Sequence, residues 1–246
     1  MKIVVIVPSR YGSTRFAGKP LALIAGKRML EWVYESAKKA KQVEDVVVAT
    51  DDQRIFDAVT DFGGSALMTA PDNRSGTDRV AEAAQKMSLG EQDIVVNVQG
   101  DQPLLNPCCI DEVVAPFAAV PDLEMSTLAF KIVKENEITD PKDCKVTFDR
   151  EGYALYFSRS PIPCARDRNT AFDTYKHLGI YAYTKRFLDV FRELPSGKIE
   201  MIEKLEQLRA LEHGHRIMVV ITEHDSPEVD HPEDILGIER IIQQST

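Results

Sequence analysis

Three cations follow the first apolar run of the chain. The stretch "VIVPSRYGSTRFAGKPL" (5–21) begins like a strand and then presents Arg10, Arg15 and Lys19 with two glycines between them. Three positive charges on one loop repel each other unless a polyanion lies among them. Glycine-rich loops after a strand can bind phosphate through backbone N–H groups, although this spacing matches neither a P-loop nor a dinucleotide-binding fingerprint. A solvated basic loop is the alternative, but the position at a strand end favours a triphosphate clamp.

Two aspartates far apart in the sequence form a second set of candidates. Asp101 lies in "VQGDQP", directly after an apolar strand-like run, and Asp230 lies in "EVDHPED", just before the final helical stretch. Taken singly, Asp101 could cap a turn and Asp230 could cap a helix. As a pair they suit Mg²⁺, which binds a few carboxylates together with substrate phosphates.

Composition restricts the class of partner. The 246 residues carry a net charge of −9, which argues against binding to nucleic acid. Positive charge confined to one loop of such a chain predicts a small anionic ligand instead. Four cysteines without a CxxC pair predict free thiols and a cytoplasmic location. No apolar run approaches the length of a membrane span, and the N-terminus lacks the features of a signal peptide, so we expect no membrane association.

The first hundred residues alternate between strand and helix patterns. Strands are predicted at 2–7, 45–50, 66–69 and 93–98, and helices at 28–41, 52–63 and 76–87. Thr77 or Asp78 is the predicted N-cap of the third helix. Apolar strands without alternation, separated by amphipathic helices, indicate a parallel sheet covered on both faces. Ligands of such sheets bind at the carboxyl ends of the strands, which are predicted at 8–19, 50–52, 69–77 and 99–103.

The pattern changes after residue 107. Further strands are predicted at 126–132, 145–149, 153–158, 178–184 and 217–222, and helices at 185–193, 198–214 and 231–244. Turn signals between the short strands indicate a small mixed or antiparallel extension. With no repeat or linker in the sequence, we predict one α/β domain over 1–246. We expect a three-layer α/β/α architecture with a mostly parallel, Rossmann-like sheet and a small mixed-strand extension.

The opening loop also resembles a known family. "PSRYGSTRFAGKPL" (8–21) is similar to the signature loop of sugar nucleotidyltransferases, and more narrowly to that of the 3-deoxy-manno-octulosonate (Kdo) cytidylyltransferases. Ala17 departs from the proline that this family usually has before the glycine and lysine. Seven further blocks resemble family segments in the same order: "VATDD" (48–52), "SGTDR" (75–79), "VNVQGDQPL" (96–104), "YALYFSRSPIP" (153–163), "KHLGIYAY" (176–183), "EKLEQLRALEHG" (203–214) and "EVDHPEDI" (228–235).

The resemblance implies an activity, and it assigns different ligands to the two halves of the chain. It implies transfer of CMP from CTP to Kdo or to its 8-amino analogue, with release of pyrophosphate, for lipopolysaccharide biosynthesis. Mg²⁺ is the implied cofactor, and the fold is implied to be of the nucleotide-diphospho-sugar transferase type. Residues 1–107 would mainly bind CTP, whereas 108–246 would mainly bind the sugar acid and form a homodimer.

The resemblance also assigns residues. It implies catalytic roles for Arg10, Arg15, Lys19 and Asp101, and metal binding by Asp101 and Asp230. Nucleotide contacts are implied for Pro8, Arg10, Lys19, Ser75, Gly76, Arg79 and Gln99. Sugar contacts are implied for Gln99, Arg159, His177, Tyr181, Glu206 and Gln207.

The preferred acceptor stays open at this point. The segment before "YKHLG" is short for the family, and "FDTYKHLGIYAYTKRF" (172–187) is more similar to the subgroup that acts on the 8-amino sugar. An ammonium group on the acceptor would need an acidic partner, for which Glu200, Glu203 and Glu206 are candidates. The alternatives are a CMP-sialate synthetase and a non-catalytic nucleotide sensor, although a sensor would not need paired metal carboxylates.

Overall fold

A nine-stranded sheet forms the frame of the computed structural model, which describes residues 1–12, 16–167 and 170–244. Seven strands follow one another in the order β11-β7-β10-β6-β1-β4-β5. Their bounds are β1 (Ile3–Ser9), β4 (Asp45–Thr50), β5 (Ser65–Met68), β6 (Ile94–Val98), β7 (Met125–Lys131), β10 (Tyr175–Thr184) and β11 (Met218–Thr222). β6, β1, β4 and β5 pair in parallel, whereas β10 runs antiparallel to both β6 and β7. The predicted α/β class is confirmed, and the sheet becomes mixed beyond β6.

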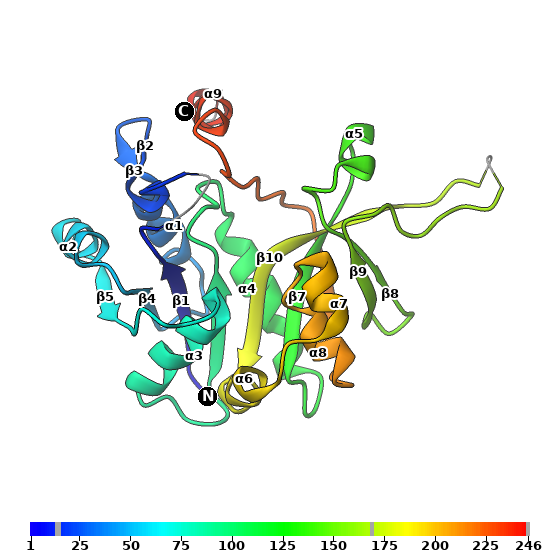
Figure 1. Cartoon of the computed structure of the whole chain (residues 1–246), viewed down its shortest axis with the longest axis horizontal. Helices are drawn as coiled ribbons and strands as arrows, with labels where there is room; N and C mark the ends of the chain where they lie inside the picture. Colours follow the sequence, from blue (N-terminus) through cyan, green and yellow to red (C-terminus); the bar gives the residue numbers. More distant parts are fainter. Residues whose placement is uncertain (13–15, 168–169, 245–246) are drawn as a thin grey trace.

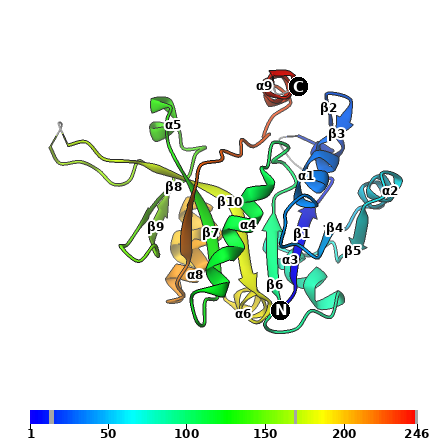
Figure 2. The same ribbon diagram turned by 180° about the vertical axis from the view of Figure 1, so that it is seen from behind.

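Helices cover both faces of the sheet. One face packs on α1 (Met29–Ala37), α2 (Gln53–Asp61) and α4 (Pro107–Val114). The other packs on α3 (Gly76–Lys86), α6 (Lys185–Glu193), α7 (Lys198–Glu203) and α8 (Leu208–Glu212). Figure 1 shows the α3 and α6 side, and Figure 2 shows the α4 side. Because the central strands are buried on both faces, their apolar runs are continuous rather than alternating. No helix in the described ranges is long and apolar enough to cross a bilayer.

Smaller elements surround this frame. β8 (Lys145–Phe148) and β9 (Ala154–Ser158) form a side extension in which β8 also pairs with the start of β10. α5 (Glu135–Thr139) precedes the extension, and two short 3₁₀ helices are η1 (Lys19–Leu21) and η2 (Ala115–Ala118). After β11 the chain crosses to α9 (Asp234–Gln244), which packs on the hairpin of β2 (Leu23–Ile24) and β3 (Lys27–Arg28) (Figure 1).

Several helices differ from the prediction. The N-cap of α3 is Ser75, whose Oγ accepts from the N–H of Asp78, and not Thr77 or Asp78. The predicted helix over 198–214 is divided into α7 and α8, because Lys204 adopts a left-handed conformation with φ of 55°. α4 was not predicted from the sequence, and α9 begins at Asp234 rather than near residue 232.

A buried ion cluster ties the extension to the crossing segment. The Nζ atom of Lys176 on β10 lies 3.0 Å from Oδ2 of Asp225 and 3.1 Å from Oε2 of Glu137. The lysine side chain is only 7% exposed. Burial lowers the pKa of Lys176, but the hydrogen bonds and charges of both carboxylates outweigh burial, so the net shift is upward. β10, α5 and the segment after β11 therefore share one charged contact.

Removal of this ammonium should destabilise the fold. We expect Lys176→Met to lower the free energy of unfolding by about 2–4 kcal/mol, because it leaves two carboxylates without their buried cation. Lys134→Met is the matched control, since Lys134 contacts the same Glu137 at 3.5 Å but is 66% exposed. The control should cost less than about 1 kcal/mol. Urea unfolding followed by circular dichroism measures both, and equal losses would contradict the role assigned to Lys176.

Candidate functional site

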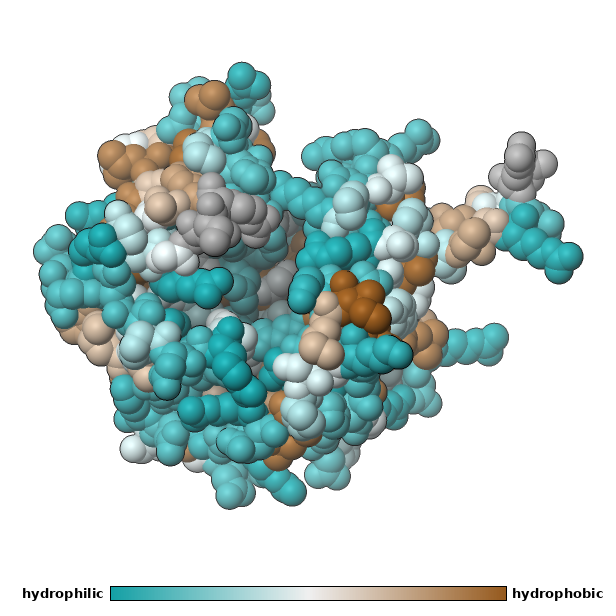
Figure 3. All heavy atoms as spheres, in the orientation of Figure 1, coloured by the Kyte–Doolittle hydropathy of each residue, from teal (hydrophilic) through white to brown (hydrophobic). Residues whose placement is uncertain are grey.

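Two adjoining cavities open at the carboxyl ends of β1 and β6. The smaller cavity, of about 230 Å³, contains among its lining residues Pro8, Arg10, Lys19, Ser75, Gly76, Arg79, Gln99 and Asp101. The larger cavity, of about 660 Å³, contains Gln99, Asp101, Arg159, His177, Tyr181, Glu206, Gln207 and Asp230. Figure 3 shows the surface hollowed between the two halves of the molecule. Every catalytic, nucleotide, sugar or metal residue named from the sequence lines one cavity or both, except Arg15, which lies outside the described residues. Of the three acids considered for an ammonium group, Glu206 lines the larger cavity, whereas Glu200 and Glu203 line neither.

The smaller cavity has a narrow slot between β1 and α3. A Cβ atom added to Gly76 would lie 3.5 Å from Cγ of Pro8 and 4.0 Å from Oε1 of Gln99. The absence of a side chain at Gly76 therefore keeps open the space between the ring of Pro8 and the first turn of α3. A flat group can enter such a slot, and the N-terminal N–H groups of α3 lie beside it.

Arg79 has a supporting position in the smaller cavity. Its guanidinium donates to Oγ1 of Thr69 at 2.5 Å and lies 3.2 Å from Oδ2 of Asp51. Only 4% of the residue is exposed. Arg79 therefore fixes the ends of β4 and β5 to α3, so its charge is largely committed to Asp51.

Lys19 and two carboxylates meet where the cavities join. Nζ of Lys19 lies 2.6 Å from Oδ2 of Asp101 and 3.7 Å from Oδ1 of Asp230, and it donates to the carbonyl oxygen of Val229 at 2.8 Å. The N–H of Val229 donates in turn to the carbonyl oxygen of Asp101. The loop after β1, the loop after β6 and the segment before α9 are therefore held together at one point.

The arrangement of these acids fits a hard divalent cation. Oδ1 of Asp101 is buried and has no hydrogen-bond partner in the described part of the chain, which leaves an oxygen for a ligand. Glu228 lies beside the pair, and burial followed by the charges of Asp101 and Asp230 raises its pKa to about 7. Among the described residues, no group of three His, Cys, Asp or Glu side chains could hold a metal by itself. Mg²⁺ does not require one, since phosphates and water complete its shell.

Glu228 was not identified from the sequence. Its only signal is its place two residues before Asp230 in an acidic segment. In the structure Gln102 donates to its Oε1 at 3.2 Å, and Gly179 leaves room for that oxygen. The fold thus brings a third carboxylate to a place where the sequence predicted two.

Arg159 supplies a positive charge to the wall of the larger cavity. Its guanidinium donates to the carbonyl oxygens of Glu203 at 2.7 Å, Pro141 at 2.9 Å and Lys204 at 3.4 Å. These main-chain acceptors fix the orientation of the guanidinium without cancelling its charge. An acidic ligand can therefore be attracted to this wall.

His177 and Tyr181 provide neutral polar groups. Nε2 of His177 lies 3.0 Å from Oγ1 of Thr127, and the imidazole centroid lies 5.1 Å from that of Tyr181. Burial lowers the pKa of His177 to about 3, so its imidazole is neutral at physiological pH. Burial also raises the pKa of Tyr181, so its hydroxyl stays protonated. Both side chains can exchange hydrogen bonds with sugar hydroxyls without carrying charge.

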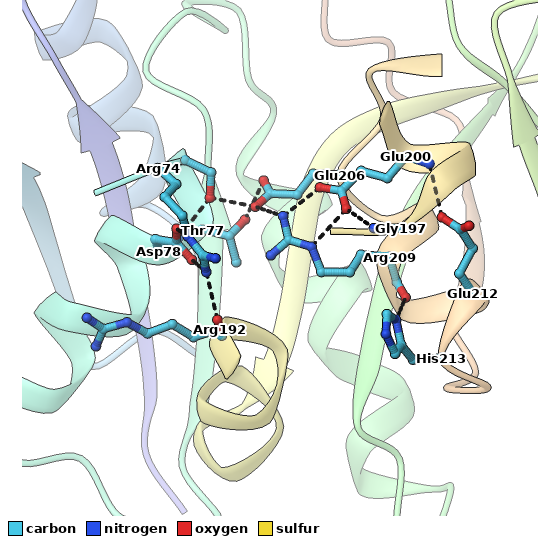
Figure 4. Close-up of polar contacts among 11 residues, drawn as sticks. Arg74, Thr77, Asp78, Arg192, Gly197, Glu200, Glu206, Arg209, Glu212 and His213 are labelled. Carbon is cyan, nitrogen blue, oxygen red and sulfur yellow. Dashed lines mark hydrogen bonds and ion pairs between the residues drawn. The ribbon is translucent and has the colours of Figure 1, made fainter. Parts of the chain in front are cut away.

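Glu206 connects the linings of the two cavities. Its carboxylate accepts from Oγ of Ser75 at 2.6 Å and from Oγ1 of Thr77 at 2.9 Å, both at the start of α3. Arg209 lies 3.9 Å away and is itself held by Glu200 (Figure 4). Burial raises the pKa of Glu206 while the two hydroxyl donors oppose that shift. The interruption between α7 and α8 therefore lets Glu206 reach α3.

The depressed pKa of His177 predicts a pH effect on stability. As pH falls below 6.5 the unfolded chain takes up a proton on this residue, whereas the folded imidazole stays neutral to a pH of about 3. The stability contributed by neutral His177 is complete above pH 6.5 and is lost progressively as the pH falls from 6.5 to about 3. The free energy of unfolding should fall in both proteins when the pH is lowered from 6.5 to 4.5. In His177→Gln this fall should be about 1–2 kcal/mol smaller than in the parent protein.

Urea unfolding at several pH values measures this difference. His213→Gln is the control, since it makes the same substitution at an exposed histidine that lines neither cavity. An unchanged slope in His177→Gln would show that the imidazole titrates normally in the fold.

Comparison with known proteins gives consistent matches. The cytidylyltransferase family model matches residues 4–217. A 3-deoxy-manno-octulosonate cytidylyltransferase of Desulfosudis oleivorans is 65% identical over 98% of both chains. An 8-amino-3,8-dideoxy-manno-octulosonate cytidylyltransferase of Shewanella frigidimarina is 54% identical over 96% of both chains. Relatives named for either acceptor therefore match over nearly the whole chain, and the one named for Kdo has the higher identity.

Solved structures agree with these matches. A structure of CMP:2-keto-3-deoxy-manno-octonic acid synthetase complexed with CTP is 40% identical, with a TM-score of 0.93 and 100% coverage of both chains. A 4-diphosphocytidyl-2C-methyl-D-erythritol synthase is 12% identical with a TM-score of 0.66 over 98% of both chains, which shows a shared fold only.

Proposed function

The chain belongs to the cytidylyltransferase family, and from that premise we propose that it transfers CMP from CTP to Kdo or its 8-amino analogue and releases pyrophosphate. The observation that carries this proposal is the junction of the two cavities at Gln99 and Asp101. One cavity is bordered by the cations of the loop after β1, and the other by the charge of Arg159. A nucleotide and a sugar acid can thus meet at one boundary.

The geometry suits a direct displacement. The reacting hydroxyl of the acceptor would lie near Gln99, in line with the α-phosphate of CTP and opposite the departing pyrophosphate. Arg10, Arg15 and Lys19 would stabilise the negative charge of the pyrophosphate. No covalent intermediate is required, since the sugar hydroxyl itself is the nucleophile.

We propose that Asp101 and Asp230 hold Mg²⁺ in the active complex. When bound, this ion supplies charge neutralisation at the α-phosphate and orients the sugar oxygen. The chain contributes the buried Oδ1 of Asp101, which has no partner among the described residues, and the contact that holds the segment before α9 against the loop after β6. Lys19 lies at the same point, so the phosphate-binding loop and the carboxylates converge there.

The remaining site residues divide between the two ligands. We propose that Pro8, Ser75, Gly76 and Arg79 surround the cytosine and ribose, with Arg79 acting through the strand ends that it fixes. We further propose that Arg159 binds the carboxylate of the sugar acid. The hydroxyls of the sugar would contact Gln99, His177, Tyr181, Glu206 and Gln207. We place the reaction in the cytoplasm and expect a homodimer.

An assay of pyrophosphate release tests the activity. The protein is supplied with CTP, Mg²⁺ and, in separate reactions, Kdo, its 8-amino analogue and a sialic acid. We expect release with at least one of the two octulosonic acids and little with the sialic acid. Turnover of the sialic acid alone would identify a CMP-sialate synthetase, and binding of CTP without any turnover would identify a nucleotide sensor.

Asp101→Asn tests the metal assignment. We expect kcat to fall at least about a hundredfold, since even indirect supports of a metal cost up to that amount. The fold should remain, because the change also removes one of three carboxylates that repel each other. Steady-state kinetics at saturating Mg²⁺, with circular dichroism as the control for folding, measures both. A kcat close to that of the parent would refute the role of Asp101.

Lys19→Ala and Arg15→Ala test the triphosphate clamp. Each should weaken binding of CTP by roughly tenfold or more, and binding of CMP by less, because the lost cation acts on the β- and γ-phosphates. Lys27→Ala is the control, since Lys27 contacts Glu35 on α1 and lines neither cavity. Titration calorimetry that finds equal losses for CTP and CMP would contradict the clamp.

A further inference from the structure

The larger cavity is more acidic than an anionic ligand would favour. Its described lining contains six carboxylates and four cations. The carboxylates are Asp101, Asp143, Glu206, Asp225, Glu228 and Asp230, and the cations are Lys142, Arg159, Lys176 and Lys204. Carboxylates repel the acid group of a sugar acid. The net charge of this lining therefore favours a ligand that carries positive charge in addition to its acid group.

Five of the six carboxylates have partners that account for them. Lys19 lies beside Asp101 and Asp230, where Mg²⁺ is also proposed. The other pairs are Glu206 with Ser75 and Thr77, Glu228 with Gln102, and Asp225 with Lys176. The charges near the reaction point are thus balanced without any contribution from the acceptor.

Asp143 is the exception. This half-buried residue lies just before β8, and its carboxylate accepts no hydrogen bond from any residue in the described ranges. Burial raises the pKa of Asp143, and the charge of Lys176 opposes the shift. A carboxylate that faces a ligand cavity without a donor of its own can accept one from the ligand.

Asp143 is displaced along β10 from the reaction point. β10 runs between Gln99 and the loop of Asp143. A Cβ at Gly179 would lie 3.5 Å from Cγ of Gln99. Two residues earlier on the strand, the N–H of His177 donates to the carbonyl oxygen of Cys144, which is next to Asp143. His177 precedes Gly179 by two residues and a strand advances about 3.3 Å per residue, so the contact of His177 with the loop of Asp143 lies roughly 7 Å along β10 from the contact of Gly179 with Gln99. An acceptor that reacts at Gln99 and extends along β10 brings its other end to Asp143.

We propose that Asp143 binds an ammonium group on the terminal carbon of the acceptor, which makes the 8-amino sugar the preferred substrate. The inference rests on the proposed cytidylyl transfer and adds which of the two acceptors is used. An ammonium group donates a charge-assisted hydrogen bond to a carboxylate, whereas a hydroxyl donates a weaker one. The acids considered from the sequence are engaged elsewhere, since Glu200 binds Arg209 and Glu203 binds Ser158.

Kinetics with both sugars tests this assignment. kcat/KM is measured for Kdo and the 8-amino sugar with the parent protein, Asp143→Asn, Glu228→Gln and the control Asp140→Asn. Asp140 lies on the same loop and carries the same charge but is not among the lining residues described. We expect the parent to favour the 8-amino sugar. Asp143→Asn should lower kcat/KM for that sugar by about tenfold to a hundredfold while changing the value for Kdo only a few-fold.

The outcomes separate this inference from the proposed function. Three outcomes would overturn the role of Asp143 and leave cytidylyl transfer standing. The parent could favour Kdo, Asp143→Asn could lose equal activity with both sugars, or selectivity could be lost in Glu228→Gln alone. Retained turnover of Kdo shows that the variant is folded. If neither sugar is turned over, the proposed function fails. Titration calorimetry of the two sugars on the parent and Asp143→Asn then still decides the role of Asp143, which fails if the variant binds the 8-amino sugar as tightly as the parent does.

Discussion

The contact between Lys19 and two carboxylates organises the site. Asp101 and Asp230 come from distant parts of the sequence, and with Glu228 they would repel each other at this distance without a cation between them. The ammonium of Lys19 offsets part of that repulsion and also holds the carbonyl oxygen of Val229. The loop after β1, the loop after β6 and the segment before α9 therefore have their relative positions set by one charge.

β10 joins the two halves of the molecule. It pairs antiparallel with β6 and β7, and its start also pairs with β8, so it adjoins the parallel strands and the extension at once. His177, Gly179 and Tyr181 follow one another on this strand, and all three border the larger cavity. This wall of the larger cavity is thus a continuation of the sheet that positions Gln99. A second connection, from Glu206 to Ser75, closes the opposite side of the cavity.

The sequence was sufficient for the features that depend on local pattern. The apolar runs of β1, β4 and β6 and the grouping of candidates at their carboxyl ends follow from burial on both faces. The division between α7 and α8 could not be predicted, because "EKLEQLRALEHG" retains helical spacing, whereas the left-handed conformation of Lys204 and the contact of Glu206 with α3 belong to the folded structure. Asp143 and Glu228 were missed for a related reason: an acidic residue has no distinguishing signal until the fold buries it beside other charges.

The segment that carries Asp230 has a consequence for the order of folding. Lys19 and Val229 are separated by 210 positions, so their contact closes a very long loop and cannot precede the formation of the sheet. α9 packs on the small hairpin of β2 and β3 rather than on the central core, and few described residues of this helix are buried. Such a peripheral unit can detach at a free-energy cost below that of global unfolding. The protein can therefore populate a state with an intact sheet in which the segment of Asp230 has left Asp101 and Lys19, so that the proposed metal site is lost before the fold itself.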